Sequence, residues 1–249
     1  MNRVVVTGIG VIAPGSIGKE NFWNNIQNGR VFTGPITMLD CSDLRIQIAG
    51  EIKGFKDDKY IEPRNGVSSE NLERAEKLAI KTLTMALDDS KLNINKDQNV
   101  VIALGTTMGK TFKGPEKSVD YKIAEDLISM ENNPDDAMLQ KITITGIITN
   151  LCKYFDFKNA ETRMFLNACA AGNYSIGWGF DKIKNGDADV ALVGGVDALS
   201  FPALMGFNRL LSLTPNVCRP FDKNRKGLIV SEASAFLILE ELNSAIKRG

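Results

Sequence analysis

The sequence has 249 residues, of which 43% are hydrophobic, so it is long enough to bury the core of one large α/β domain. Thirty basic residues balance thirty acidic ones, and this neutral charge gives no reason to expect nucleic acid or an anionic membrane surface as a partner. No apolar run reaches the roughly 18 residues of a membrane span, and no signal peptide precedes the first predicted strand.

Short apolar runs alternate with amphipathic stretches from one end of the chain to the other. In chain order they predict a strand at 4–7, helices at 22–26 and 69–86, a strand at 100–104, a helix at 134–154, a strand at 163–166, a helix at 170–184, a strand at 188–193, a helix at 203–211, a strand at 235–239 and a helix at 241–248. Glycines should end the first strand at 8–10, Ser69 should cap the second helix, and Asn133 and Pro134 should begin the third.

This alternation predicts one layered α/β domain over residues 1–249, with a mostly parallel sheet flanked by helices. The strands are continuously apolar, which indicates a sheet that is covered on both faces. The glycines at 8–10 also fit the start of a dinucleotide-binding motif. No second strand ends in an acidic residue about 20 positions later, so the sequence disfavours dinucleotide binding.

The chain has four cysteines at wide, irregular spacing and no histidine. Without a CxxC pair, neither a zinc site nor a redox dithiol is expected, and four cysteines in a chain of this length do not predict a disulfide scaffold. We therefore expect reduced thiols in a cytoplasmic protein. Any mechanism that needs an imidazole base must obtain it from another chain.

Cys169 lies where a predicted strand ends and a helix begins, within the stretch Asn167–Asn173. Unpaired N–H groups at a helix N-terminus carry partial positive charge, which stabilises a thiolate and can bind the oxyanion formed when a thioester is attacked. Cysteine is also both a strong nucleophile and a good leaving group in acyl transfer. The alternative is an inert buried thiol, which is the commoner state of a free cysteine.

The helix predicted after Cys169 contains Gly172, Gly177 and Gly179. Each glycine costs about 1 kcal/mol relative to alanine in a helix interior. Tertiary packing has to offset that cost, so we expect a buried helix in close contact with other backbones.

Five groups of residues, in this order along the chain, resemble the motifs of β-ketoacyl-(acyl carrier protein) synthases. They are 4–15 with Phe22-Trp23, the loop Gly105–Gly109, the segment 167–173 with 183–190 and 194–198, the loop 219–227 and the strand end 237–242. The resemblance covers the N-terminal half of that family from residue 1 to residue 249 and is weakest over 113–135. It implies the thiolase fold, in which two similar α/β halves form five layers, usually in a homodimer.

The resemblance also implies a decarboxylating Claisen condensation in fatty acid or polyketide synthesis. Cys169 would accept an acyl chain from a phosphopantetheine thioester, and the carbanion left by decarboxylation of malonyl-acyl carrier protein would then attack it. The family's catalytic histidines and lysine and its second oxyanion donor lie in the C-terminal half, so this chain should lack full activity alone. The alternative is a non-catalytic synthase subunit or isolated module that binds carrier protein or sets chain length.

The family's acyl pocket suggests Met108 as a substrate-binding residue, with Phe201 and Phe207 as further candidates and core packing as the alternative for all three. No metal or redox cofactor is implied, because phosphopantetheine arrives on the acyl carrier protein. Where the family usually has Gly-Glu-Gly-Ala-Gly, residues 231–235 read Ser-Glu-Ala-Ser-Ala, and their Cβ atoms should change the local backbone. A lone half should expose a large apolar face, so we expect a homodimer or a complementary C-terminal-half chain.

Overall fold

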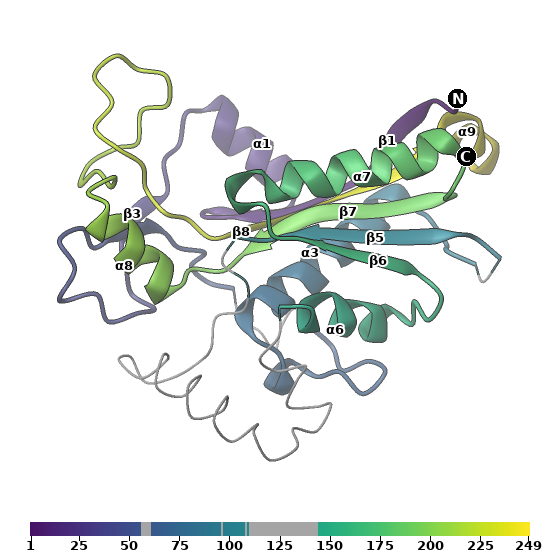
Figure 1. The fold of residues 1–249 in the computed structure, drawn as a ribbon, viewed down its shortest axis with the longest axis horizontal. Helices are drawn as coiled ribbons and strands as arrows, with labels where there is room; N and C mark the ends of the chain where they lie inside the picture. Colours follow the sequence, from purple (N-terminus) through teal and green to yellow (C-terminus); the bar gives the residue numbers. More distant parts are fainter. Residues whose placement is uncertain (56–60, 96, 108, 110–143) are drawn as a thin grey trace.

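A six-stranded sheet with the order β2-β1-β8-β7-β5-β6 forms the centre of the protein. The structure is a computed structural model that describes residues 1–55, 61–95, 97–107, 109 and 144–249. The strands of this sheet are β1 (Val4–Ala13), β2 (Ser16–Ile17), β5 (Val100–Gly105), β6 (Glu161–Phe165), β7 (Val190–Asp197) and β8 (Ala233–Glu241) (Figure 1).

The sheet is mixed, as the α/β prediction requires, but it is less parallel than expected. Strand β5 pairs in parallel with β6 and with β7, whereas β8 is antiparallel to β7 and to β1, and β2 is antiparallel to β1. The parallel strands bring their C-terminal ends to one edge of the sheet. That edge carries the segment with Cys169.

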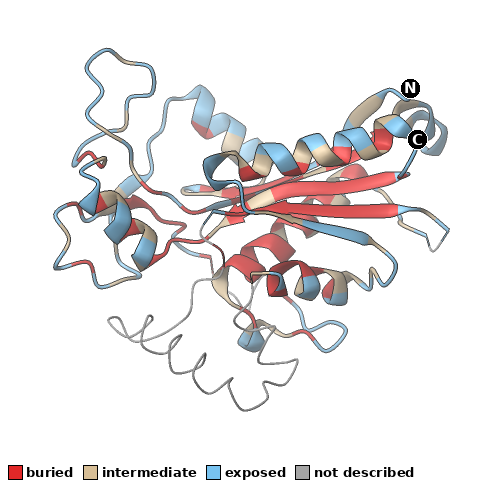
Figure 2. Ribbon diagram, in the orientation of Figure 1, coloured by how far each residue is buried: buried red, intermediate tan, exposed pale blue. Residues whose placement is uncertain are grey.

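Helices cover both faces of the sheet, as the apolar strands predicted. Helices α3 (Arg74–Ser90) and α6 (Gly146–Phe155) lie on one face, and α7 (Ala171–Asn185) lies on the other (Figure 1). Successive side chains of β5 point to opposite faces of the sheet and so belong to two parts of the core. Ile102 and Leu104 pack towards α3 and α6, while Val101 and Ala103 pack towards α7. Strands β5 and β7 are therefore almost wholly buried (Figure 2).

The first strand is longer than predicted, because it runs through its glycines to Ala13. The backbone of α3 crosses these glycines at close range. A Cβ atom on Gly8 would lie 2.2 Å from the carbonyl oxygen of Ala86, and one on Gly10 would lie 2.0 Å from that of Thr82. Close packing of a helix against the strand therefore explains this glycine pattern, which sequence reasoning took for a strand end.

Two helix starts also differ from the sequence prediction. Helix α3 begins at Arg74, because Glu73 and Glu76 form a capping box, whereas Ser69 lies in a separate short 3-10 turn, η1 (Ser69–Asn71). Helix α6 begins at Gly146 within the predicted helical stretch. The predicted start at Asn133 and Pro134 lies outside the described residues.

A second, smaller core lies beside the end of the sheet, next to the two-stranded sheet of β3 (Thr33–Pro35) and β4 (Ile48–Gly50) and to helix α8 (Phe201–Arg209). Its buried members are Cys41, Ile46, Ala49, Leu199, Leu204, Leu213 and Val230. The side chain of Asn208 joins two of its segments, because it accepts from the Ile46 N–H at 2.8 Å and donates to the Ile46 carbonyl at 3.2 Å.

A buried ion pair links this smaller core to the main sheet. Glu232, which precedes β8, is fully buried and accepts two hydrogen bonds from the guanidinium of Arg74, at 2.7 and 2.8 Å. The same carboxylate accepts the backbone N–H groups of Ile52 at 2.7 Å and of Leu199 at 3.3 Å. One side chain therefore joins four separate segments.

The chain termini lie close together at the far end of the sheet (Figure 1). Helix α9 (Leu242–Arg248) packs there, where Arg248 donates to Glu240 at 2.7 and 2.9 Å. Helix α1 (Lys19–Gln27) follows β2, and Lys19 forms an ion pair with Asp89 of α3. Among the helices in the described part of the chain, none has the length and apolar character needed to cross a bilayer.

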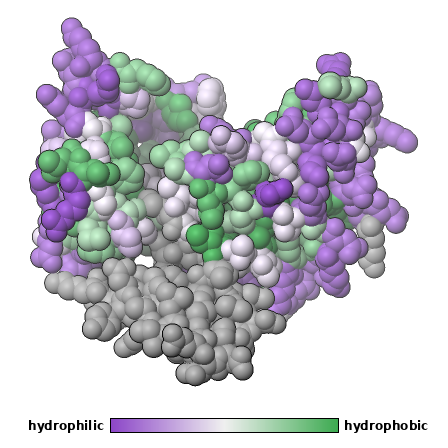
Figure 3. All heavy atoms as spheres, in the orientation of Figure 1, coloured by the Kyte–Doolittle hydropathy of each residue, from purple (hydrophilic) through white to green (hydrophobic). Residues whose placement is uncertain are grey.

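Apolar side chains are exposed on the face that carries α7, as expected for a partly covered sheet. Val6 and Ile9 of β1 are 50% and 40% exposed, and Tyr174 and Phe180 of α7 are 55% and 41% exposed. Figure 3 shows hydrophobic residues beside a hollow between the loop that precedes β8 and the end that carries both termini.

Candidate active site

Cys169 lies in the turn between β6 and α7, as the sequence predicted. The chain leaves β6 at Phe165, forms the 3-10 turn η3 (Ala168–Ala170), and enters α7 at Ala171. Ala168 has a φ of +49°, a left-handed conformation that costs a non-glycine residue about 1–3 kcal/mol. The turn places Cys169 on the surface, where its side chain is exposed.

Close packing fixes the start of α7 against the ends of β5 and β7. A Cβ atom on Gly105 would lie 2.3 Å from the carbonyl carbon of Ala171, so only glycine permits this approach. Ser175, one turn further along α7, donates to the Ala103 carbonyl at 2.8 Å and accepts the Gly194 N–H at 3.0 Å. The hydroxyl of Ser175 therefore ties the helix that follows Cys169 to two strands.

Only one face of α7 is buried, which corrects the expectation that its glycines all contact other backbones. Ala171, Ser175, Gly179 and Ile183 form the buried face at a spacing of four residues. A Cβ atom on Gly179 would lie 2.3 Å from Cγ1 of Val193, whereas Gly172 and Gly177 have open space beside them.

Hydrogen bonds between strand ends and the cysteine turn form a network that the sequence analysis did not anticipate. Thr107 donates through Oγ1 to the carbonyl oxygen of Ala168 at 2.8 Å. Asp197, at the end of β7, accepts the Thr107 N–H at 2.9 Å and the Thr106 hydroxyl at 2.7 Å. Both threonines belong to the glycine-containing loop noted in the sequence, but a motif does not reveal contacts across about 60 or 90 residues.

Cys169 opens onto a cavity of about 420 Å³ at this edge of the sheet. Its lining comes from the ends of β5, β7 and β8 and from the start of α7, and most of these residues are small. They are Gly105, Thr106, Thr107, Ala168, Cys169, Ala171, Gly172, Asn173, Ile176, Gly194, Gly195, Val196, Asp197, Ser231, Ala233, Ser234, Ala235 and Leu237. The site thus offers an accessible thiol at a helix start beside a mainly apolar space, an arrangement that suits acyl transfer from a thioester.

Burial distinguishes two of the other cysteines from Cys169. Burial raises the pKa of the Cys152 thiol to about 11, so that this thiol stays protonated at neutral pH. Burial, and then the charges of Asp40 and Glu51, also raise the pKa of Cys41. All four cysteines are free thiols, and Cys169 is the exposed one.

The other predicted site residues are Met108, Phe201 and Phe207. Met108 lies outside the described residues. Phe201 and Phe207 are on α8 and pack against the smaller core, and neither is among the residues that line the cavity beside Cys169. Within the described residues, no three His, Cys, Asp or Glu side chains come together as metal ligands would.

The stretch 231–235, where the sequence departs from the family's glycines, contains no residue in a left-handed conformation. Strand β8 begins within this stretch, at Ala233. Ser231 donates through its hydroxyl to the Gly50 carbonyl at 3.2 Å, while Ala233 and Ala235 line the cavity. An extended strand is open to any residue, so the added Cβ atoms occupy the cavity wall without forcing a turn.

Comparisons with known proteins agree with this geometry. Residues 1–245 match the family model "Beta-ketoacyl synthase, N-terminal domain". The chain is 30% identical to 3-oxoacyl-(acyl-carrier-protein) synthase 2 of Synechocystis sp. and to the tetracenomycin polyketide synthase ketoacyl synthase alpha subunit of Streptomyces glaucescens, over 99% of its own length. The solved ishigamide ketosynthase/chain length factor superposes on the whole chain with a TM-score of 0.85 and 34% identity.

The chain spans 59% of the length of each of those two relatives and 60% of the solved chain. The thiolase-like fold predicted from the motifs is confirmed by this superposition. Because the family model covers nearly the whole chain, the protein belongs to the β-ketoacyl synthase family and corresponds to its N-terminal domain.

Proposed function

We propose that this chain is the N-terminal part of an acyltransferase that condenses an acyl thioester with malonyl-acyl carrier protein in fatty acid or polyketide synthesis. The observation that carries the proposal is the exposed thiol of Cys169, at the start of α7 and at the edge of a cavity of small residues. The names of the two curated relatives, one a 3-oxoacyl synthase and the other a polyketide ketoacyl synthase, support the same reaction class.

In the proposed reaction, the Cys169 thiolate attacks the carbonyl carbon of an acyl thioester, and the phosphopantetheine thiolate leaves. Partial positive charge at the start of α7 stabilises the attacking sulfur and the oxyanion that develops. A malonyl thioester then loses carbon dioxide, and its carbanion attacks the acyl carbon. The new carbon–carbon bond releases the Cys169 thiolate and leaves a β-ketoacyl thioester.

The second step of the proposed reaction requires a hydrogen-bond donor beside the carbanion. Decarboxylation leaves a carbanion beside a thioester carbonyl, whose negative charge needs a hydrogen-bond donor, and the 249 residues contain no histidine. Because the relatives are longer, we propose that a complementary C-terminal part supplies this donor and covers the apolar face beside α7. A homodimer is the further assembly that we propose, in the cytoplasm.

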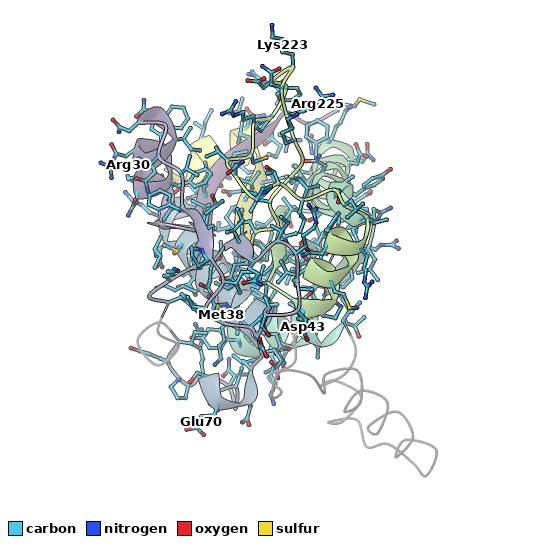
Figure 4. The ribbon with its side chains drawn as sticks, turned by 90° about the vertical axis from the view of Figure 1, so that its left-hand side faces the viewer. Arg30, Met38, Asp43, Glu70, Lys223 and Arg225 are labelled. Atoms are coloured by element: carbon cyan, nitrogen blue, oxygen red, sulfur yellow. The ribbon has the colours of Figure 1, made fainter. Side chains whose placement is uncertain are left out.

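The proposed partner is an acyl carrier protein. The loop between α8 and β8 exposes four basic side chains, and the labelled Lys223 and Arg225 project at its tip (Figure 4). Their charge would attract the phosphate of the phosphopantetheine group that carries the acyl chain. Phosphopantetheine on this partner is the only prosthetic group that the proposal invokes. A role for Met108, Phe201 and Phe207 in acyl binding stays a prediction.

Reconstitution of the condensation tests the proposal. The chain is mixed with a separately expressed C-terminal half of a relative, an acyl thioester and malonyl-acyl carrier protein, and the β-ketoacyl product is measured by mass spectrometry. We expect product with the parent chain and none with Cys169→Ala. Equal amounts of product from the parent chain and from Cys169→Ala would overturn the role of Cys169. If the parent chain binds acyl carrier protein but is not acylated, the result would favour a non-catalytic subunit.

A further inference from the structure

Thr107 contacts the one residue of the cysteine turn whose backbone is in a left-handed conformation. Its Oγ1 donates to the carbonyl oxygen of Ala168 at 2.8 Å, and Ala168 has a φ of +49°. This carbonyl belongs to the peptide group that links Ala168 to Cys169. Thr107 lies 61 positions before Ala168, so the contact depends on the tertiary fold.

Thr107 is itself fixed by its neighbours at the C-terminal ends of the strands. Asp197 accepts the Thr107 N–H at 2.9 Å and the Thr106 hydroxyl at 2.7 Å. Thr106 is buried, and its N–H donates to the carbonyl of Phe165, the last residue of β6, at 3.0 Å. The donor to Ala168 is therefore held by β5, β6 and β7 together, not by a free loop.

A fixed carbonyl also fixes the N–H on the other side of the same peptide group. A trans peptide is planar, and its N–H points opposite to its C=O. The hydrogen bond from Thr107 thus sets the direction of the Cys169 N–H and, through the adjoining Cα, the direction from which the Cys169 side chain leaves the backbone. The Ala171 N–H also donates to the Ala168 carbonyl, so Thr107 supplies the contact with this carbonyl that comes from outside the turn, and it opposes the tendency of Ala168 to return to a right-handed or extended backbone.

We propose that Thr107 is a positioning residue for Cys169, which acts by holding the strained Ala168–Cys169 peptide in place. Thr107 is exposed, so a merely structural hydrogen bond there would exchange with water at little cost to folding. Its loss should therefore change the reactivity of Cys169 more than the stability of the chain. This role of Thr107 rests on the proposed function, in which the Cys169 thiol is the acyl acceptor.

The test compares Thr107→Val, which removes the hydroxyl, with Thr107→Ser, which keeps it. Thr149→Val is the matched control, because it removes a similar hydroxyl-to-carbonyl bond from Thr149 to Thr145 on α6. Rates of Cys169 modification are measured by peptide mass spectrometry with two reagents, iodoacetamide and an acyl N-acetylcysteamine thioester. Thermal unfolding of each variant is followed alongside.

We expect Thr107→Val to slow both modifications about fivefold, the factor that corresponds to one hydrogen bond, while Thr107→Ser and Thr149→Val stay close to the parent. Unchanged or faster modification in Thr107→Val, or a loss that serine does not restore, overturns the proposal. The two reagents distinguish a failure of this proposal from a failure of the proposed function. If the parent reacts with iodoacetamide but takes no acyl group, the function fails, and the iodoacetamide series still decides the role of Thr107.

Discussion

At the scale of single residues, the surroundings of Cys169 differ from those of the other thiols. Burial raises the pKa of the Cys152 and Cys41 thiols, whereas the Cys169 side chain is exposed at a helix start. Position in the sequence was enough to predict this location, because a strand end, a turn and a helix start leave a local pattern. The hydroxyl that contacts the turn comes from 61 residues away and leaves no such pattern.

Loss of Glu232 should strongly destabilise the chain. Glu232→Ala removes the acceptor for Arg74 and for the Ile52 N–H, and leaves both groups without their closest partner. Removing one member of a buried pair costs about 3–5 kcal/mol, so the free energy of unfolding measured with urea should fall by that amount.

The matched control is Glu161→Ala, which removes a half-exposed carboxylate that pairs with Lys182 at 2.8 Å. A surface pair contributes about 1 kcal/mol or less. Equal losses in Glu161→Ala and Glu232→Ala would show that the buried carboxylate does not join the four segments as described.

At the scale of elements, glycines were the main source of error in the sequence prediction. The pattern predicted most strands and helices of the described residues, but it treated glycine as a signal for a strand end or a close helix contact. In β1, Gly8 and Gly10 instead admit the backbone of α3, and in α7 only Gly179 meets a close neighbour. A position requires glycine where a neighbouring backbone or side chain leaves no room for a Cβ atom. Only the packed structure shows which positions these are.

Two glycines of α7 should therefore respond in opposite ways to alanine. Gly179→Ala places a Cβ atom 2.3 Å from Val193 and should lower the free energy of unfolding by about 1–3 kcal/mol. Gly177→Ala meets open space and should raise it by up to about 1 kcal/mol, because alanine is the better helix former. Denaturant unfolding measures both, and a loss of stability in Gly177→Ala would contradict this description of the exposed face.

The ion pair between α1 and α3 predicts a dependence of stability on pH. Burial alone would raise the pKa of Asp89, but hydrogen bonds from Lys19 and from the Ile9 N–H outweigh it and lower the pKa below its ordinary 3.8. A lowered carboxyl pKa stabilises the folded state above the unfolded value, and that stabilisation is lost as pH falls through the folded value.

Asp89→Asn should therefore unfold at a lower temperature than the parent at neutral pH, and the gap should close as pH falls below about 4. Thermal melts across the acid range measure this gap. Asp187→Asn, which changes an exposed carboxylate after α7, is the control and should follow the parent throughout. A gap that persists unchanged in acid would show that the charge of Asp89 contributes nothing.

At the scale of the whole molecule, the sheet has one well-covered face and one partly covered face. Helices α3 and α6 cover the first, while α7 leaves Val6 and Ile9 of β1 exposed on the second. The order and pairing of the strands could not be predicted from the sequence, because every pairing of this sheet except that of β1 with β2 joins segments that lie far apart in the chain. The motifs, in contrast, identified the family before the strands were placed.

The basic loop at the end of the molecule predicts a difference between large and small acyl donors. Lys223→Glu should slow acyl transfer to Cys169 from an acyl carrier protein roughly two- to fivefold, and the effect should weaken with salt. Transfer from a small acyl thioester should not change, because such a donor does not need the loop. Lys247→Glu on α9, at the far end of the molecule, is the matched control, and an equal effect there would exclude a specific role for the loop.

Competition among the four thiols for an acyl group decides whether Cys169 is the acyl acceptor. The chain is incubated with an acyl phosphopantetheine thioester at mildly alkaline pH, well below the value of about 11 at which Cys152 ionises, and each cysteine peptide is quantified by mass spectrometry. We expect one acyl group per chain, attached to Cys169. Acylation of Cys41, Cys152 or Cys218 at a comparable rate, or of no cysteine while Cys169 still reacts with iodoacetamide, would contradict this role of Cys169.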